Sequence, residues 1–193
     1  GAAADALLRM WRRLRLLLAL AAAAPTTCCI MQNATLFGPD KQRVENPCTA
    51  LGGKQVALYF AADWCPLCRR FTPALRAFYE AHAAELQIVF VSSDASPRAA
   101  ARHFRDQGNW LMLAKSDPLI PELKRRYGVW SMREDGEFNV PGAPSRRRGG
   151  LPSVVVISPE GEEVRCVQPP STACVNPPRR SYTCNHRIAA SVP

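Results

Sequence analysis

The most constraining feature of this 193-residue chain is a Cys-x-x-Cys motif placed where a buried strand meets a helix. Residues 55–61 form an apolar run of strand length, and residues 66–82 carry apolar side chains at helical spacing. Cys65 therefore lies at a helix N-terminus, where free backbone N–H groups and a partial positive charge stabilise a thiolate. Cys68 lies one turn further on the same face. It can attack a mixed disulfide formed on Cys65, so the motif predicts thiol–disulfide exchange.

The main alternative for such a motif is half of a zinc site, which needs two further ligands. The chain after residue 165 offers Cys166, Cys174, Cys184 and His186. Their spacings of eight, ten and two residues match no common zinc pattern. Two structural or vestigial thiols are the remaining alternative. We predict a redox dithiol, with no bound metal and no bound cofactor.

Strand-like and helix-like segments alternate through the middle of the chain, which favours an α/β fold with a central sheet flanked by helices. Beyond residue 86 the predicted segments are a strand at 87–92, a helix at 97–108 with Ser96 as N-cap, a short apolar piece at 110–114, a helix at 118–127, and strands at 152–157 and 162–166. We expect His82 and His103 at the surface or at helix ends, without a catalytic role.

One long polar segment, residues 131–150, interrupts this alternation with acids followed by Arg146–Arg148. Loops of such length are functional or disordered. We expect these arginines either to be solvated loop residues or to recognise an acidic partner protein. The predicted organisation is an N-terminal basic and apolar segment at 1–35, one domain at 36–166, and a Pro-rich disordered tail at 167–193.

The formal net charge of +9 suggests nucleic acid only at first sight. Residues 1–35 and 166–193 each carry +3, which leaves +3 for the large middle part, so we predict no nucleic-acid partner. Residues 10–24 could associate with a membrane, and residues 10–30 resemble a mitochondrial or secretory targeting segment. A start near Met31 would instead predict a cytoplasmic protein.

The motif and its surroundings resemble the tryparedoxin and nucleoredoxin branch of the thioredoxin superfamily. The resemblance runs over residues 36–165 and is most specific in Leu58–Leu75, which contains Trp-Cys-Pro-Leu-Cys and Phe-Thr-Pro. It implies a thioredoxin fold with a mixed sheet, Cys65 as the attacking thiol and Cys68 as the resolving thiol. It also implies a cis Leu151–Pro152 bond facing the dithiol, where the backbone of Leu151 would pair with a substrate strand.

The same resemblance implies a monomeric protein-disulfide reductase with a redox-active disulfide. Trp64 and Pro66 would shape its active site. Substrates would be disulfide-containing proteins such as a peroxidase, and electrons would come from a small dithiol such as trypanothione or from a reductase. A nucleoredoxin-like redox-gated binding module and a membrane-tethered or exported thioredoxin-like protein are the alternative readings.

Three positions distinguish this chain within the resemblance. Tryparedoxins typically carry Pro where this chain has Leu67. Tyr59 stands six residues before Cys65, where ordinary thioredoxins carry a buried Asp. No helical pattern follows residue 166, so we expect the last helix of the fold to be missing and one sheet face to lack cover.

Overall fold

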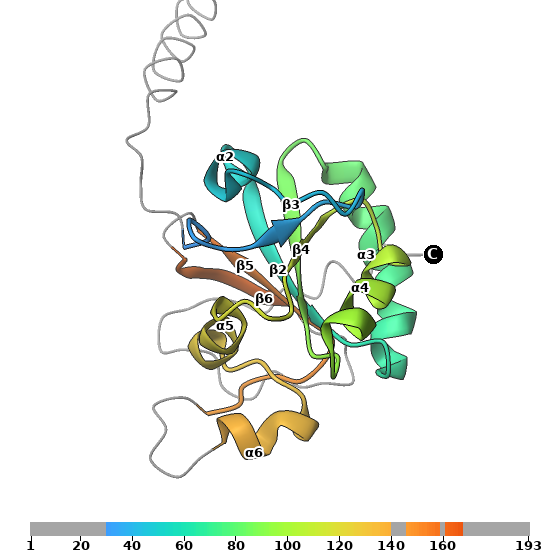
Figure 1. The fold of residues 1–193 in the computed structure, drawn as a ribbon, viewed down its shortest axis with the longest axis vertical. Coiled ribbons are helices and arrows are strands. Elements are labelled where there is room, and N and C mark those ends of the chain that lie inside the picture. The colour runs from blue at the N-terminus through green and yellow to red at the C-terminus, as the bar shows by residue number, and fades with distance from the viewer. Residues whose placement is uncertain (1–29, 140–145, 159–160, 168–193) are drawn as a thin grey trace, which may run out of the picture.

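A mixed six-stranded sheet, with strand order β1-β4-β3-β2-β5-β6, forms the centre of the molecule (Figure 1). This computed structural model describes residues 30–139, 146–158 and 161–167. Strands β2, β3 and β4 run parallel, whereas β1, β5 and β6 pair antiparallel with their neighbours. The strands are β1 (Leu36–Phe37), β2 (Gln55–Ala61), β3 (Leu86–Ser92), β4 (Leu111–Leu113), β5 (Ser153–Ile157) and β6 (Glu163–Val167). The predicted α/β fold with a mixed sheet is confirmed.

Helices lie on both sides of this sheet (Figure 1). They are α2 (Pro47–Leu51), α3 (Pro66–His82), α4 (Pro97–Arg105), α5 (Leu119–Tyr127), the 3-10 turn η1 (Met132–Glu134) and α6 (Asp135–Phe138). Helices α3 and α4 lie on one side, and α5 lies on the other. At the centre of the sheet these helices cover both faces of β3, which is buried along its whole length, as expected for a central parallel strand.

An aromatic cluster fills the space between the sheet and α3. The rings of Tyr59 and Trp110 meet edge-on with centroids 6.2 Å apart, and Tyr79 meets Trp110 at 5.6 Å. Phe90 lies 6.2 Å from Tyr59 on the neighbouring strand. Such tilted and edge-on pairs add to the stabilisation from apolar burial. Through Tyr79, the cluster packs α3 against the sheet.

The predicted bounds of β2 and α3 are confirmed, and the helix predicted at 97–108 is shorter than expected. Helix α4 begins after Ser96, whose Oγ accepts the N–H of Ala99 at 3.2 Å, and it ends at Arg105. Asp106 is the C-cap residue, and the side chain of Gln107 beyond it hydrogen-bonds both His103 and Trp110. Strand β1 and helix α2 were not predicted, because two and five residues are too few for a periodic pattern.

The segment 131–150 is not one irregular loop. Ser131 forms a capping box with Glu134 that begins η1, and α6 follows directly. Phe138 is buried against Trp130, with ring centroids 5.4 Å apart. Arg148 forms a two-point ion pair with Glu163. The polar composition of the segment did not predict this order, because only a few contacts, such as that of the buried Phe138 ring, hold it in place.

The two ends of the chain bear on several predictions. Met31 and Ala34 are buried in the core, ahead of the predicted domain start. The tail was predicted to begin at residue 167, but Val167 ends β6 and pairs with Val154. Residues 10–29 of the targeting or membrane segment, the rest of the tail at 168–193 and the prediction of a missing last helix fall outside the described residues. Within the described part of the chain, no helix has the length and apolar character to span a membrane.

Candidate active site

The Cys-x-x-Cys motif caps the first turn of α3. Cys65 is the N-cap residue, and its Sγ accepts the backbone N–H of Cys68 at 3.2 Å. Pro66 occupies the first helical position, where a missing N–H costs no hydrogen bond. Both sulfurs are free thiols, Cys65 with 6% of its surface exposed and Cys68 fully buried. Only the first cysteine is therefore open to a substrate.

The two thiols have opposite acidities. The hydrogen bond with the Cys68 side chain lowers the pKa of Cys65 to about 6, with burial opposing and the N–H groups of Cys68 and Leu67 assisting. The same hydrogen bond and burial raise the pKa of Cys68. Cys65 is therefore mostly a thiolate at pH 7, while Cys68 keeps its proton. This division suits one attacking and one resolving thiol.

The Leu151–Pro152 peptide bond is cis, as predicted, and it faces the dithiol. The carbonyl oxygen of Leu151 lies 3.8 Å from Cys65 Sγ. Ser153 fixes this turn by donating from Oγ to the carbonyl of Gly150 at 2.6 Å. The structure thus brings together Cys65, Cys68 and Leu151 from positions 86 residues apart.

Beneath Cys68, Tyr59 takes part in a short hydrogen-bonded chain. Its hydroxyl lies 2.9 Å from Thr72 Oγ1, and Thr72 donates to the carbonyl of Cys68 at 2.8 Å. Burial raises the pKa of Tyr59 above its usual range, so this hydroxyl keeps its proton. Tyr59 supports the first turn of α3 as a neutral group and carries no charge beneath the dithiol.

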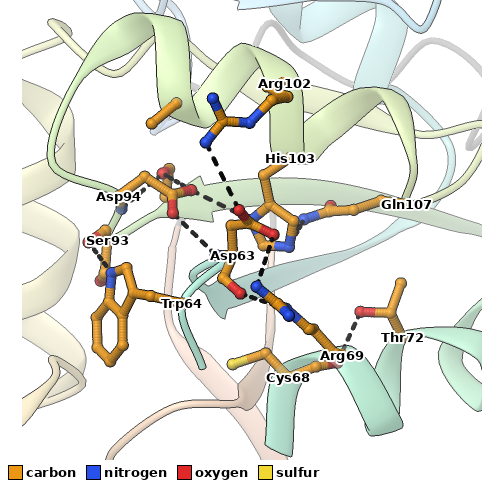
Figure 2. Close-up of polar contacts among 12 residues, drawn as sticks. Asp63, Trp64, Cys68, Arg69, Thr72, Ser93, Asp94, Arg102, His103 and Gln107 are labelled. Carbon is orange, nitrogen blue, oxygen red and sulfur yellow. Dashed lines mark hydrogen bonds and ion pairs between the residues drawn. The ribbon is translucent and has the colours of Figure 1, made fainter. Parts of the chain in front are cut away.

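A buried polar network lies behind the motif, and it corrects the prediction for His103 (Figure 2). His103 is buried, and its Nδ1 lies 3.1 Å from Asp94 Oδ2. Gln107 donates to His103 Nε2 and accepts from Trp110 Nε1, each at 3.1 Å. His103 does lie on a helix, as predicted, but its ring is buried in contact with Asp94 and Gln107 rather than exposed. His82 is exposed, as expected.

The same network holds the residues that precede Cys65. Asp94 accepts the backbone N–H of Asp63 at 2.8 Å. Burial alone would raise the pKa of Asp94, but hydrogen bonds from His103, Asp63 and Ser92 together lower it. Asp94 and His103 therefore face each other at 3.1 Å within this network. No sequence motif predicted the contact between Asp94 and His103, because Asp94 lies in the loop after β3 and His103 lies on the buried face of α4.

Trp64 is half-buried beside the motif and is held from two sides. Its Nε1 donates to the carbonyl of Ser93 at 3.3 Å (Figure 2). The guanidinium carbon of Arg133 lies 4.0 Å from the centroid of the Trp64 ring. Arg133 belongs to η1, so the start of the segment 131–150 lies beside the active-site motif. Arg133 itself was not predicted, because nothing in the sequence distinguishes it from other exposed arginines.

The described residues contain no group of three or more His, Cys, Asp and Glu side chains able to hold a metal ion. Cys166 lies on β6, while Cys174, Cys184 and His186, the other ligands considered for zinc, fall outside the described residues.

Comparison with known proteins agrees with this site and fold. A thioredoxin-like family model matches residues 52–163. Tryparedoxin of Trypanosoma brucei brucei is 38% identical over 86 residues, which are 43% of this chain and 59% of that protein. Probable nucleoredoxin 2 of Oryza sativa subsp. japonica is 31% identical over 140 residues, 70% of this chain and 30% of that protein. This chain thus spans less than two thirds of either relative's length.

Solved structures show the same likeness. Thioredoxin from Wuchereria bancrofti superimposes with a TM-score of 0.55 and 30% identity, over 71% of this chain and 83% of that one. Tryparedoxin I from Leishmania major has the same fold, with a TM-score of 0.51 and 23% identity over 69% of this chain and 79% of that one. The similarity to thioredoxin-family oxidoreductases of the tryparedoxin and nucleoredoxin branch is confirmed, and this chain belongs to the thioredoxin-like family.

Proposed function

We propose that this chain is a protein-disulfide reductase of the tryparedoxin type. The observation that carries this proposal is the position of Cys65 Sγ. The sulfur caps α3, accepts the N–H of Cys68 at 3.2 Å and has a pKa of about 6. It also lies 3.8 Å from the Leu151 carbonyl, and of the two cysteines only Cys65 has exposed surface.

In the first step, the Cys65 thiolate attacks one sulfur of a substrate disulfide. A bond forms between Cys65 and that sulfur, the substrate disulfide breaks, and its second sulfur leaves as a thiolate that takes up a proton. The low pKa of Cys65 supplies the thiolate at neutral pH. The 6% exposure of Cys65 gives access to an extended substrate segment.

In the second step, Cys68 loses its proton and attacks Cys65 Sγ. The Cys65–Cys68 disulfide forms, the mixed disulfide breaks, and the released substrate sulfur takes up a proton. The substrate has then gained two electrons and two protons, which the two thiols have lost. The full burial of Cys68 keeps it from attacking substrate directly, so it acts only on the mixed disulfide.

The remaining predicted site residues position the substrate. An extended substrate segment would pair with the backbone of Leu151, which borders Cys65, in the manner of strand addition. Trp64 and Pro66 would flank the attacked disulfide. Pro152 would hold Leu151 in place. Substrates would be oxidised proteins such as a peroxidase, and a small dithiol such as trypanothione, or a reductase, would restore the two thiols.

The test is turnover of a protein disulfide by the full 193-residue chain. Insulin and an oxidised peroxidase serve as substrates, and dithiothreitol, trypanothione or a reductase with NADPH serves as donor. We expect turnover that is lost in Cys65→Ser and kept in Cys48→Ser, a matched change at a half-buried cysteine in α2. Folded protein without turnover would contradict the proposal.

A redox-gated binding module is a second candidate, because a nucleoredoxin alignment covers 70% of this chain. In that case the oxidation state of the dithiol would control the capture of a partner protein, and turnover would be slow. Oxidised and reduced protein should then retain different partners on a column. Fast turnover with the same partners in both states would exclude this candidate.

A further inference from the structure

The Arg133 side chain is fixed over the active-site tryptophan although it is exposed to solvent. Its guanidinium carbon lies 4.0 Å from the centroid of the Trp64 ring, within cation–π distance. Trp64 directly precedes Cys65, so the positive charge stands at the rim of the site where a substrate disulfide would bind. Arg133 lies in the 3-10 turn η1, between α5 and β5.

Buried contacts hold the turn that carries Arg133. Glu134 Oε2 accepts from both the backbone N–H and Oγ of Ser131, each at 2.9 Å. The other carboxylate oxygen of Glu134 forms an ion pair with Lys124 Nζ, whose side chain is only 1% exposed. An uncompensated charge at such a site would be costly, so this ion pair strongly restricts where η1 can lie.

The same lysine connects η1 back to the tryptophan. Lys124 Nζ donates to Ser93 Oγ at 2.9 Å, and the Ser93 carbonyl accepts from Trp64 Nε1 at 3.3 Å. The contacts therefore form a closed ring through Trp64, Ser93, Lys124, Glu134 and Arg133. A ring of this kind fixes the position of Arg133 relative to Cys65 without any substrate present.

The acidic side chains of this region pair with basic groups other than Arg133. Asp63 lies within 3.5 Å of Arg69 and 3.7 Å of Arg102 (Figure 2). Glu134 is paired with Lys124. Within the part of the chain that the structure describes, no ion pair to Arg133 occurs. A fixed guanidinium at the rim of a site is the arrangement that recognises a carboxylate.

We infer that Arg133 is a specificity-determining residue that binds a carboxylate beside the cysteine attacked by Cys65. The preferred substrates would be protein segments in which Asp or Glu flanks the disulfide cysteine. This inference rests on the proposed reductase function, because it assigns a substrate class to the same site. It predicts that an acidic flank speeds the first attack rather than the later resolution.

The test uses two synthetic peptide disulfides that differ only in Asp or Asn next to the cysteine. The full chain carries Cys68→Ser, so that the mixed disulfide accumulates and mass spectrometry reads the rate of the first step alone. We expect the Asp peptide to react roughly threefold to tenfold faster at low salt. Arg133→Ala should bring the ratio of the two rates close to one, and Arg133→Glu should reverse it.

A matched control is Met132→Ala, which changes the neighbouring side chain of the same turn, 75% exposed, and should leave the ratio unchanged. High salt should reduce the preference, because the charges are near solvent. Equal rates for the two peptides with the chain that keeps Arg133, or a preference for the Asp peptide that survives Arg133→Ala, would overturn this inference alone. Absence of any adduct with either peptide would overturn the proposed reductase function as well.

Discussion

At the junction of β2 and α3, the groups that act on Cys65 come mostly from the next three residues. The N–H groups of Leu67 and Cys68 and the Cys68 thiol lower its pKa. The connection between α5 and β5 works differently, because Arg133 is held over Trp64 by a turn that its neighbour Glu134 anchors through an ion pair to buried Lys124, ten residues before Glu134. Reactivity is thus encoded in local backbone geometry and recognition in a long-range side-chain network. Mutations should separate the two.

The largest effect is expected from breaking the long-range network. Lys124→Met leaves Glu134 without its buried partner, so we expect the free energy of unfolding to fall by about 3–5 kcal/mol. Urea unfolding measures this change. The double variant Lys124→Met/Glu134→Leu removes both charges and should cost less than Lys124→Met alone. A single-variant cost below about 1 kcal/mol would show that the ion pair does not anchor η1.

The acidity of Cys65 tests the local half of the comparison. Because its pKa is lowered to about 6, alkylation by iodoacetamide should rise about tenfold per pH unit below that value and level off above it. Below that pH, protonation converts the Cys65 thiolate to the unreactive thiol. Mass spectrometry of the Cys65 peptide gives the rate. In guanidinium-unfolded chain, the same cysteine should titrate near the ordinary value of about 8.5. A folded-state midpoint near that value would contradict the local account.

The smallest effect is expected at Tyr59, beneath the dithiol. Tyr59→Phe removes the hydroxyl that lies 2.9 Å from Thr72, but Thr72 keeps its bond to the Cys68 carbonyl. No buried partner is left unsatisfied, so the cost should be about 0.5–1.5 kcal/mol of unfolding free energy. Thermal unfolding and the Cys65 titration can be measured on the same protein. A shift of the Cys65 midpoint by a full pH unit would show that this hydroxyl tunes the thiol.

The same contrast explains what the sequence could predict. The bounds of β2 and α3 followed from an apolar run and from helical spacing, because buried strands and amphipathic helices carry their own period. The Cys65–Cys68 motif could be placed at the helix start for the same reason. The cis Leu151–Pro152 bond followed only from the family resemblance, since no local pattern specifies it.

Other features depend on tertiary contacts that leave no period. Residues 131–138 are polar, yet Ser131 and Phe138 fix them through a capping box and one buried ring. His103 sits on an arginine-rich helix, yet Asp94 and Gln107 bring it into the interior. Each of these positions is set by one or two individual partners, three to nine residues away, that follow no regular spacing. Such pairs become visible only when the chain is folded.

Trapping the first covalent intermediate tests the central claim most directly. The full chain with Cys68→Ser is mixed with an oxidised protein substrate, and the adduct is located by peptide mapping. The account predicts a mixed disulfide on Cys65 that reductant releases and that Cys65→Ser/Cys68→Ser does not form. An adduct on Cys48 or Cys166 instead, or no adduct from folded protein, would contradict the assignment of Cys65 as the attacking thiol.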